Sequence, residues 1–255
     1  MTVKQLYEHL CDRVPTSLSC EWDNDGLMLS ARPEKAVCRV LCTLDVTEEA
    51  VDYAVSGGFD LILSHHPLIF RPLHHLTPDT HVSRKALRLL EAGISVISLH
   101  TRADAVLDGV NDRLCDLLGI GNVTLFGEGG EMIGRIGKLP APMSLSDFCL
   151  RVKSALGAPF VLCADAEREV SCVAVCGGDG KEYVDAARAA GADTYLSGRI
   201  GYHAMTDAPE TGINLIEAGH YYTEAHITGF FAEMLTDLIP DVQVEEFGSN
   251  ILLCL

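Results

Sequence analysis

The residues best equipped for chemistry are two adjacent histidines, His65 and His66, in the stretch ILSHHPLIF. An apolar run ends at them, and Pro67 then removes a backbone donor and stiffens the exit. Neighbouring strand residues point to opposite faces, so the pair cannot easily clasp one ion from within a regular strand. At the end of a strand the geometry is freer. Adjacent imidazoles there can serve two ions that lie close together.

Two further histidines are each followed by an acid four residues later, His100 by Asp104 and His220 by Glu224. The apolar spacing of HYYTEAHITGFFAEML predicts a helix, and on it His220 and Glu224 would share one face. Imidazole nitrogen with carboxylate oxygen suits Zn, Mn, Fe or Ni, and differs from the all-oxygen sites of Ca²⁺. Such a donor set matches a pair of divalent ions that activates water.

Each of these residues also has a simpler interpretation. A lone histidine at a strand end is most often only hydrogen-bonded, and a His/Glu pair four apart on a helix is more often solvated than part of a site. His74 and His75 form a second doublet, in RPLHHLTPD, with no acid at a matching position, and we expect them at the surface. Metal binding is favoured over these simpler interpretations if the fold brings the three histidine-bearing strand ends together.

Buried strands joined by helices must position these groups. The stretches VCRVLCTLDV, DLILS and ISVISLH are apolar and strand-like, whereas TEEAVDYAVSGG and SRKALRLLEAG have helical spacing. The first of these helices has Thr47 as its predicted cap and glycines at its end. The pattern predicts an α/β fold with largely parallel sheets. In such folds, ligands bind beyond the carboxyl ends of the strands.

The second half of the chain repeats the plan of the first. At a fixed offset of 133, residues 40–64 align without a gap on residues 173–197, and the identities include Asp60/Asp193. Any two α/β segments tend to share glycines and apolar positions, but they are less expected to share aspartates. We therefore predict a duplication.

The alignment extends by one strand, because GISVISLH (93–100) resembles GINLIEAGH (212–220) with one extra residue in the second. We predict a first α/β repeat over 1–125 and a second over 126–255. The segment 126–170 is the expected bridge between them and contains a short predicted helix, SLSDFCLRVKSAL.

Composition excludes several classes of function. Nineteen basic and 36 acidic residues give a formal charge of −17 and a pI of about 4.8, which disfavours general binding to nucleic acid or anionic lipid. No run approaches the ~18 apolar residues of a membrane span, and the N-terminus does not resemble a signal peptide, so we expect a cytoplasmic protein. The ten cysteines include no C-x-x-C pair and are expected to be reduced. The stretch CGGDG is a weak phosphate-binding signal, and a tight strand-to-helix turn is the simpler interpretation.

Five blocks together carry a family resemblance: EWDNDGLML (21–29), LDVTEEAVDYAVSGGFDLILSHHPLIF (44–70), LHTRADAVLDGVNDRL (99–114), VAVCGGDG (173–180) and INLIEAGHYYTE (213–224). With these blocks, the sequence resembles the GTP cyclohydrolase 1 type 2 homologue family, also called Nif-three-like proteins. The resemblance implies two interlocked α/β repeats, a toroidal homohexamer, and two divalent metal ions per subunit. Carried over by position, the implied ligands are His65, His66, Asp104, His220 and Glu224.

Some roles stay open within the resemblance. Either Glu224 or Asp104 is expected to bridge the two ions, and His100 fits behind the ligands or beside a substrate. Arg102 stands where the family usually has asparagine, and Arg199 where it commonly has an acid. Each of these two cations would either receive an anionic substrate or pair with nearby acids.

Two functions remain open from the sequence. One is a metal-dependent hydrolase that acts on an ester, amide or ring C–N bond of a small substrate, nucleotide-like compounds included. A triphosphate would need clustered cations, and the sequence offers only Arg71, Arg102 and Arg199, which are scattered. The other is a non-catalytic metal-binding or regulatory scaffold, since no general base stands unambiguously beside the ligands. No catalytic residue is assigned.

Overall fold

The computed structural model describes residues 1–254, which form two compact α/β units. Unit 1 comprises Met1–Ala103 and Ile227–Ile251, and unit 2 comprises Asp104–His226 with the short stretch that starts at Leu252. The chain thus leaves unit 1, builds unit 2, and returns to unit 1 with its last helix and strand.

The bounds of these units differ from the predicted repeats 1–125 and 126–255, which describe the sequence and stay a prediction. The difference has a topological reason. The last helix and strand of the second predicted repeat complete the sheet and core of unit 1.

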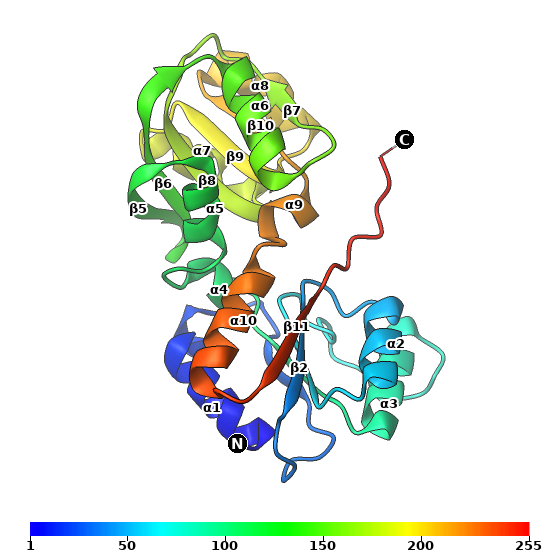
Figure 1. The fold of residues 1–255 in the computed structure, drawn as a ribbon. Helices are drawn as coiled ribbons and strands as arrows, with labels where there is room; N and C mark the ends of the chain where they lie inside the picture. Colours follow the sequence, from blue (N-terminus) through cyan, green and yellow to red (C-terminus); the bar gives the residue numbers. More distant parts are fainter. Residues whose placement is uncertain (255) are drawn as a thin grey trace. The chain divides into compact units, whose positions relative to one another are not determined.

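Unit 1 is built on a five-stranded sheet with the order β1-β4-β3-β2-β11. Its strands β2, β3, β4 and β11 are parallel, and β1 joins antiparallel at the edge. Figure 1 shows β11 beside β2, although the two come from opposite ends of the chain. The bounds are β1 (Gly26–Leu29), β2 (Arg39–Thr43), β3 (Leu61–Ser64), β4 (Ser95–Ser98) and β11 (Gln243–Phe247).

The helices of unit 1 are α1 (Val3–Arg13), the short 3₁₀ turn η1 (Thr16–Leu18), α2 (Glu48–Gly57), α3 (His81–Ala92) and α10 (Ile227–Leu238). The predicted signals of α2 are confirmed: the Thr47 hydroxyl accepts from Ala50 N at 3.1 Å, and Gly58 ends the helix at φ 66°. Helices α2 and α3 pack against each other (Figure 1). Their buried residues, among them Ala54 and Leu89, share a core with Ile62 of β3.

Unit 2 has a six-stranded sheet with the order β5-β6-β8-β9-β10-β7. Parallel pairing is confined to its centre, β8-β9-β10, and the other three strands join antiparallel. The predicted α/β class is therefore confirmed, with the more parallel sheet in unit 1. The bounds are β5 (Gly121–Glu128), β6 (Glu131–Met143), β7 (Leu162–Ala164), β8 (Val170–Asp179), β9 (Thr194–Arg199) and β10 (Asn214–Glu217).

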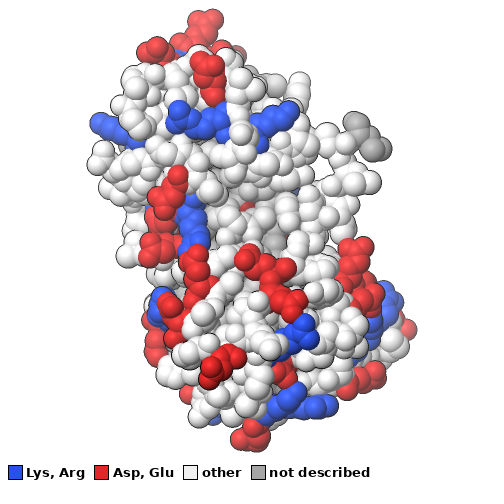
Figure 2. All heavy atoms as spheres, viewed as in Figure 1, with Lys and Arg blue, Asp and Glu red and all other residues white. Residues whose placement is uncertain are grey.

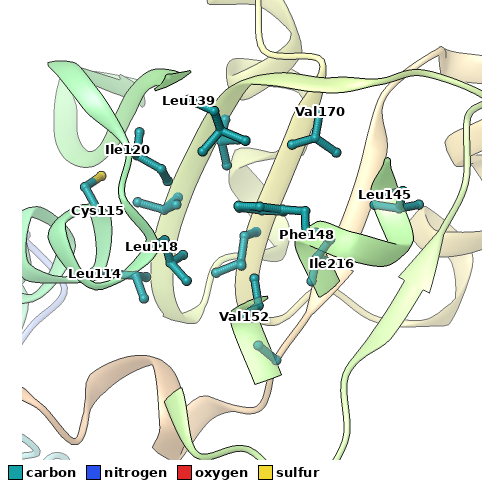
Figure 3. Close-up of a cluster of buried hydrophobic side chains, with 14 residues drawn as sticks. Leu114, Cys115, Leu118, Ile120, Leu139, Leu145, Phe148, Val152, Val170 and Ile216 are labelled. Carbon is teal, nitrogen blue, oxygen red and sulfur yellow. The ribbon is translucent and has the colours of Figure 1, made fainter. Parts of the chain in front are cut away.

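The helices that follow α3 along the chain are α4 (Thr101–Ala105), α5 (Val110–Leu118), α6 (Leu145–Leu156), η2 (Lys181–Tyr183), α7 (Val184–Ala189), α8 (Tyr202–Thr211) and α9 (His220–Glu224). Helix α6 is the predicted bridge helix. Figure 3 shows its Phe148 in one cluster with Leu118 of α5, Val170 of β8 and Ile216 of β10. This cluster is the core beneath one face of the unit 2 sheet.

One helix prediction needs correction. The stretch from His220 to Leu238 is two helices, α9 and α10, because a turn at Ala225 and His226 interrupts it. The ring of His226 hydrogen-bonds to the Val110 carbonyl at 2.8 Å. This contact fixes the turn where the chain leaves unit 2.

Strand register supports the predicted duplication. Val40 of β2 pairs with Leu61 of β3, and Val173 of β8 pairs with Thr194 of β9, which is the same pairing at the offset of 133. Figure 1 shows β2 in the unit 1 sheet, and β8 beside β9 in the unit 2 sheet.

The matched aspartates have the same structural task in both units. Each carboxylate accepts hydrogen bonds of 2.8–3.1 Å from two successive N–H groups at the start of the neighbouring strand: Cys38 and Arg39 for Asp60, Ser171 and Cys172 for Asp193. These contacts explain why an aspartate occurs at both Asp60 and Asp193, an identity that the features common to all α/β folds do not explain.

On the face drawn in Figure 2, acidic and basic side chains are interspersed. Among the helices of residues 1–254, none is long and apolar enough to cross a membrane.

Candidate metal centre

Three histidines meet at the carboxyl ends of β3 and β4 in unit 1. His65 and His66 follow β3 directly, and His100 lies two residues beyond β4. One ligand nitrogen from each ring lies within 4.8 Å of the other two, and the ring centroids are 5.0–5.6 Å apart. The parallel pairing of β3 with β4, which sets Ser64 opposite Ser98, brings the histidines together. The strand-end rule therefore explains why these three histidines lie close together.

Each of the three imidazoles is oriented through its Nδ1 atom. The partners are one carbonyl and two carboxylates: Leu99 O for His65 at 3.0 Å, Asp45 Oδ1 for His66 at 2.7 Å and Asp23 Oδ1 for His100 at 2.8 Å. With Nδ1 donating to an oxygen, Nε2 is the nitrogen that would bind an ion. Metal-ligating histidines almost always donate their second ring N–H to a carboxylate or carbonyl in this way. The donor set thus fits a divalent transition metal.

Asp23 is a site residue that the sequence interpretation did not single out. Its buried carboxylate accepts hydrogen bonds from His100 Nδ1, and from Thr101 N at 3.1 Å and Thr101 Oγ1 at 2.6 Å. Burial raises the pKa of Asp23, but the hydrogen bonds of His100 and Thr101 outweigh burial and lower that pKa to about 2. Asp23 therefore acts as a fixed negative charge behind His100. The available signal was its place in EWDNDGLML, just before the strand that pairs with β4.

Unit 2 has a donor pair of its own at the carboxyl end of β10. His220 begins α9 after Gly219, whose φ is 87°, and Glu224 ends the helix. Their atoms Nε2 and Oε2 are 3.0 Å apart. The Glu224 side chain is buried and that of His220 is 44% exposed. The two residues share one helix face, as their spacing predicts.

Glycines let α9 approach the sheet of unit 2. A Cβ atom on Gly178, which has φ 68°, would collide with Glu224 Oε1. A Cβ on Gly198 would lie 2.6 Å from Thr223 Oγ1 and 2.7 Å from His220 Cα. Thr223 Oγ1 in turn accepts from Gly178 N at 3.1 Å. The glycines of the stretch CGGDG, Gly178 in particular, thus leave room for helix α9, which carries His220 and Glu224.

The remaining predicted residues lie as follows. Asp104 is buried on α4, one helical turn after His100. Arg102 is fully buried: its Nε donates to Asp25 Oδ2 at 2.8 Å, and its guanidinium lies 5.7 Å from the centroid of the Tyr7 ring. Arg199 is exposed.

The nearest acid to Arg199 is Asp179, with Nη1 4.0 Å from Oδ2. Arg102 and Arg199 thus each have an acidic neighbour, and their part in substrate binding stays a prediction. The second doublet, His74 and His75, is exposed. The assignment of His65, His66, Asp104, His220 and Glu224 as one ligand set stays a prediction.

A family profile and two curated proteins match most of the chain. The profile of the family described as Duf34/NIF3 (NGG1p interacting factor 3) matches residues 1–251. A GTP cyclohydrolase 1 type 2 homolog of Clostridium acetobutylicum is 32% identical over 230 residues, which cover 88% of this chain and 85% of that protein. The protein of the same name from Clostridium perfringens is 33% identical over 231 residues, covering 88% and 87%.

A solved structure has the same fold. The Bacillus cereus protein related to NIF3 matches with a TM-score of 0.89 at 22% identity, over 100% of this chain and 99% of that one. The profile match covers residues 1–251, which include the histidine-bearing strand ends, and each of the two relatives covers 88% of the chain. The chain therefore belongs to the Duf34/NIF3 family.

Proposed function

We propose that the protein binds two divalent metal ions and uses them to hydrolyse a small substrate. The proposed ligands are His65, His66, Asp104, His220 and Glu224. The observation that carries the proposal is the orientation of the three clustered histidines, His65, His66 and His100, each of which has its Nδ1 hydrogen-bonded to an oxygen. Metal-ligating histidines almost always have this second-nitrogen hydrogen bond.

The chain's own residues prepare the ligands. The Leu99 carbonyl and the Asp45 carboxylate hold the proton of His65 and His66 on Nδ1, so that Nε2 is the basic nitrogen. Asp45 also adds negative charge behind His66, which increases the basicity of that ring. Glu224 and Asp104 would supply the anionic oxygens that balance two divalent charges, and one of them would bridge the ions. Zn, Fe, Mn and Ni all suit this mixture of nitrogen and oxygen donors.

When bound, the two ions would supply Lewis-acid chemistry, because they polarise a carbonyl or phosphoryl oxygen and lower the pKa of water. The positions of Arg102 and Arg199 limit how much negative charge the proposed substrate can carry. Arg102 is engaged with Asp25 inside unit 1, and Arg199 lies near Asp179. Since neither is organised to bind a triphosphate, the proposal favours a substrate with little negative charge, cleaved at an ester, amide or ring C–N bond.

The decisive experiment compares metal content in matched variants by elemental analysis. Wild-type protein should hold about two ions per subunit, as a dinuclear site requires. His66→Ala and Glu224→Ala should each lose metal, because each removes a ligand. His74→Ala, from the exposed doublet, should keep it. Equal loss in His66→Ala and His74→Ala would contradict the ligand assignment.

Turnover is tested separately on the metal-loaded protein with phosphoesters, nucleotides and cyclic amides. We expect hydrolysis that His66→Ala abolishes and His74→Ala retains. Background rates with both metal positions filled would contradict the hydrolase, and would leave the metal-binding scaffold as the function.

The assembly is a further part of the proposal. The family resemblance supports a cytoplasmic homohexameric ring. Light scattering should then give a mass near six times the 27.5 kDa of the chain, and a monomer mass would contradict the ring.

A further inference from the structure

Two exposed aromatic side chains flank the histidine cluster of unit 1. Trp22 is 57% exposed and Phe70 is 44% exposed. Their ring centroids are 6.3 Å apart, and each lies 6.2 Å from the centroid of His100 in an edge-to-face arrangement. Large aromatic groups that remain exposed next to a cluster of polar donors are typical of binding sites rather than of cores.

The aromatic pair is anchored to the cluster by its own loops. Trp22 immediately precedes Asp23, whose carboxylate is fixed by His100 and Thr101. Phe70 ends the stretch that begins with His65 and His66, and the side-chain amide of Asn24 donates to the Ile69 carbonyl. The two loops are therefore tied to each other and to the cluster. This anchoring reduces the ordering cost of binding, because the loops that carry the two rings are already held at the site.

We propose that Trp22 and Phe70 form a binding site for a planar, uncharged heteroaromatic ring whose reactive end faces the histidine cluster. The inference rests on the proposed function, since it names the class of substrate for the same centre. Aromatic side chains bind such rings by stacking, which tolerates many ring types because each has a π-face.

The charges around the pair favour an uncharged ligand. The charged groups that hydrogen-bond to the cluster are the acids Asp23, Asp25 and Asp45, which disfavour an anion. Arg71 follows Phe70 in the sequence, but it is exposed, so solvent screens its charge. Bound divalent ions would in turn repel an organic cation. A neutral ring avoids both costs and still gains contact area with Trp22 and Phe70.

Trp22 is the single tryptophan of the sequence, so its fluorescence reports on this site alone. The test titrates the zinc-loaded full-length protein with guanosine and adenosine, with excitation at the red edge of tryptophan absorption. Saturable quenching is expected with both nucleosides, and none is expected with ribose. Phe70→Leu should weaken nucleoside binding about three- to tenfold, since it keeps an apolar side chain but removes the ring.

Matched variants separate this inference from the metal proposal. Phe160→Leu changes a phenylalanine of unit 2 with nearly the same exposure, 45%, and should leave nucleoside binding unchanged. Phe70→Leu should keep the wild-type metal content. His66→Ala should lose metal and still show quenching by nucleosides, because the ring contacts the aromatic side chains.

Three results would overturn the inference. The first is non-saturating quenching in the wild type, and the second is equal nucleoside affinity in Phe70→Leu and Phe160→Leu. The third is a changed mass for Trp22→Leu or Phe70→Leu in light scattering, which would make the pair an interface between copies. A His66→Ala variant that keeps its metal would instead overturn the proposed function and leave the quenching result standing.

Discussion

The ends of strands β3 and β9 are equivalent by register and differ in chemistry. Ser64 in β3 and Ser197 in β9 occupy the same position at the offset of 133. In unit 1 two imidazoles follow the serine. In unit 2 Gly198 and Arg199 take those positions, and a Cβ on Gly198 would collide with Thr223 and His220 of α9. One unit thus carries its donors on the strand end, and the other leaves space there for a helix that carries them.

The serine hydroxyl supports both arrangements. Ser64 Oγ donates to the His66 carbonyl at 2.9 Å, which fixes the histidine doublet. Ser197 Oγ accepts from Gly180 N at 3.0 Å and lies 3.2 Å from the Gly178 carbonyl, which fixes the glycine turn under α9. The comparison teaches that the two units share strand register and the aspartate contacts, while the histidines lie at a strand end in one unit and on a helix in the other.

The largest effect is expected from placing the unit 1 residue in unit 2. In Gly198→His the new Cβ would meet the Gly178 carbonyl and His220 Cα, at 2.6 and 2.7 Å, and backbone cannot easily give way. We expect a loss of about 3 kcal/mol or more in the free energy of unfolding, measured by urea denaturation. Gly121→Ala is the control, because its Cβ would meet only Lys138 O at 3.9 Å. Equal stability of Gly198→His and wild type would contradict the close approach of α9.

The shared aspartates come next. Asp60→Ala and Asp193→Ala should each destabilise the protein by about 2–3 kcal/mol, because each leaves two backbone N–H groups without their carboxylate. Both side chains are buried, so water restores little of the loss. Calorimetry of the two variants measures the effect. A large loss in only one of them would show that the aspartates do not have equivalent tasks, and would weaken the case for duplication.

A smaller effect is expected on metal affinity in unit 1. Asp45→Asn keeps an oxygen near His66 Nδ1 but removes the negative charge behind the ring, and should weaken zinc binding about tenfold. Competition with a chelator measures this. Asp52→Asn, whose side chain is 64% exposed and pairs with Arg88 on the surface, should bind zinc like the wild type. Unchanged affinity in Asp45→Asn would argue that His66 does not ligate through Nε2.

Features with local causes could be predicted from the sequence. Helix α2 was predicted with its Thr47 cap and its glycine end because both signals lie within the helix's own residues. The His65, His66 and His100 cluster followed from the general rule for parallel strands. The shared face of His220 and Glu224 followed from helical spacing.

Features that depend on long-range contact were missed. Asp23 reaches His100 across 77 residues, and Arg102 finds Asp25 across the same separation. Nothing in the pattern around either residue states which partner the fold will supply. The break between α9 and α10 was missed for the same reason, since His226 hydrogen-bonds to Val110, 116 residues earlier.

The smallest effect is a difference in acid sensitivity between wild type and Asp60→Asn. Burial raises the pKa of Asp60, but the Lys35 ammonium and the N–H groups of Cys38 and Arg39 outweigh burial and lower it below 3.8. A lowered folded pKa means that the carboxylate stabilises the protein above its unfolded pKa and that this stability is lost as the pH falls through the folded value.

Below about pH 4, the free energy of unfolding should therefore fall less steeply with pH in Asp60→Asn than in the wild type. The difference between the two slopes should be smaller than about 1.4 kcal/mol per pH unit, which is the limit for one proton. Lys35→Gln is the informative companion. Because Lys35 makes the largest contribution to the lowered Asp60 pKa, this variant should lose free energy of unfolding with falling pH less steeply than the wild type and more steeply than Asp60→Asn. Urea denaturation at several acidic pH values measures how the free energy of unfolding depends on pH in the wild type and in the two variants. Equal slopes in wild type and Asp60→Asn would mean that the Asp60 carboxylate is no more stabilised in the folded protein than in the unfolded chain.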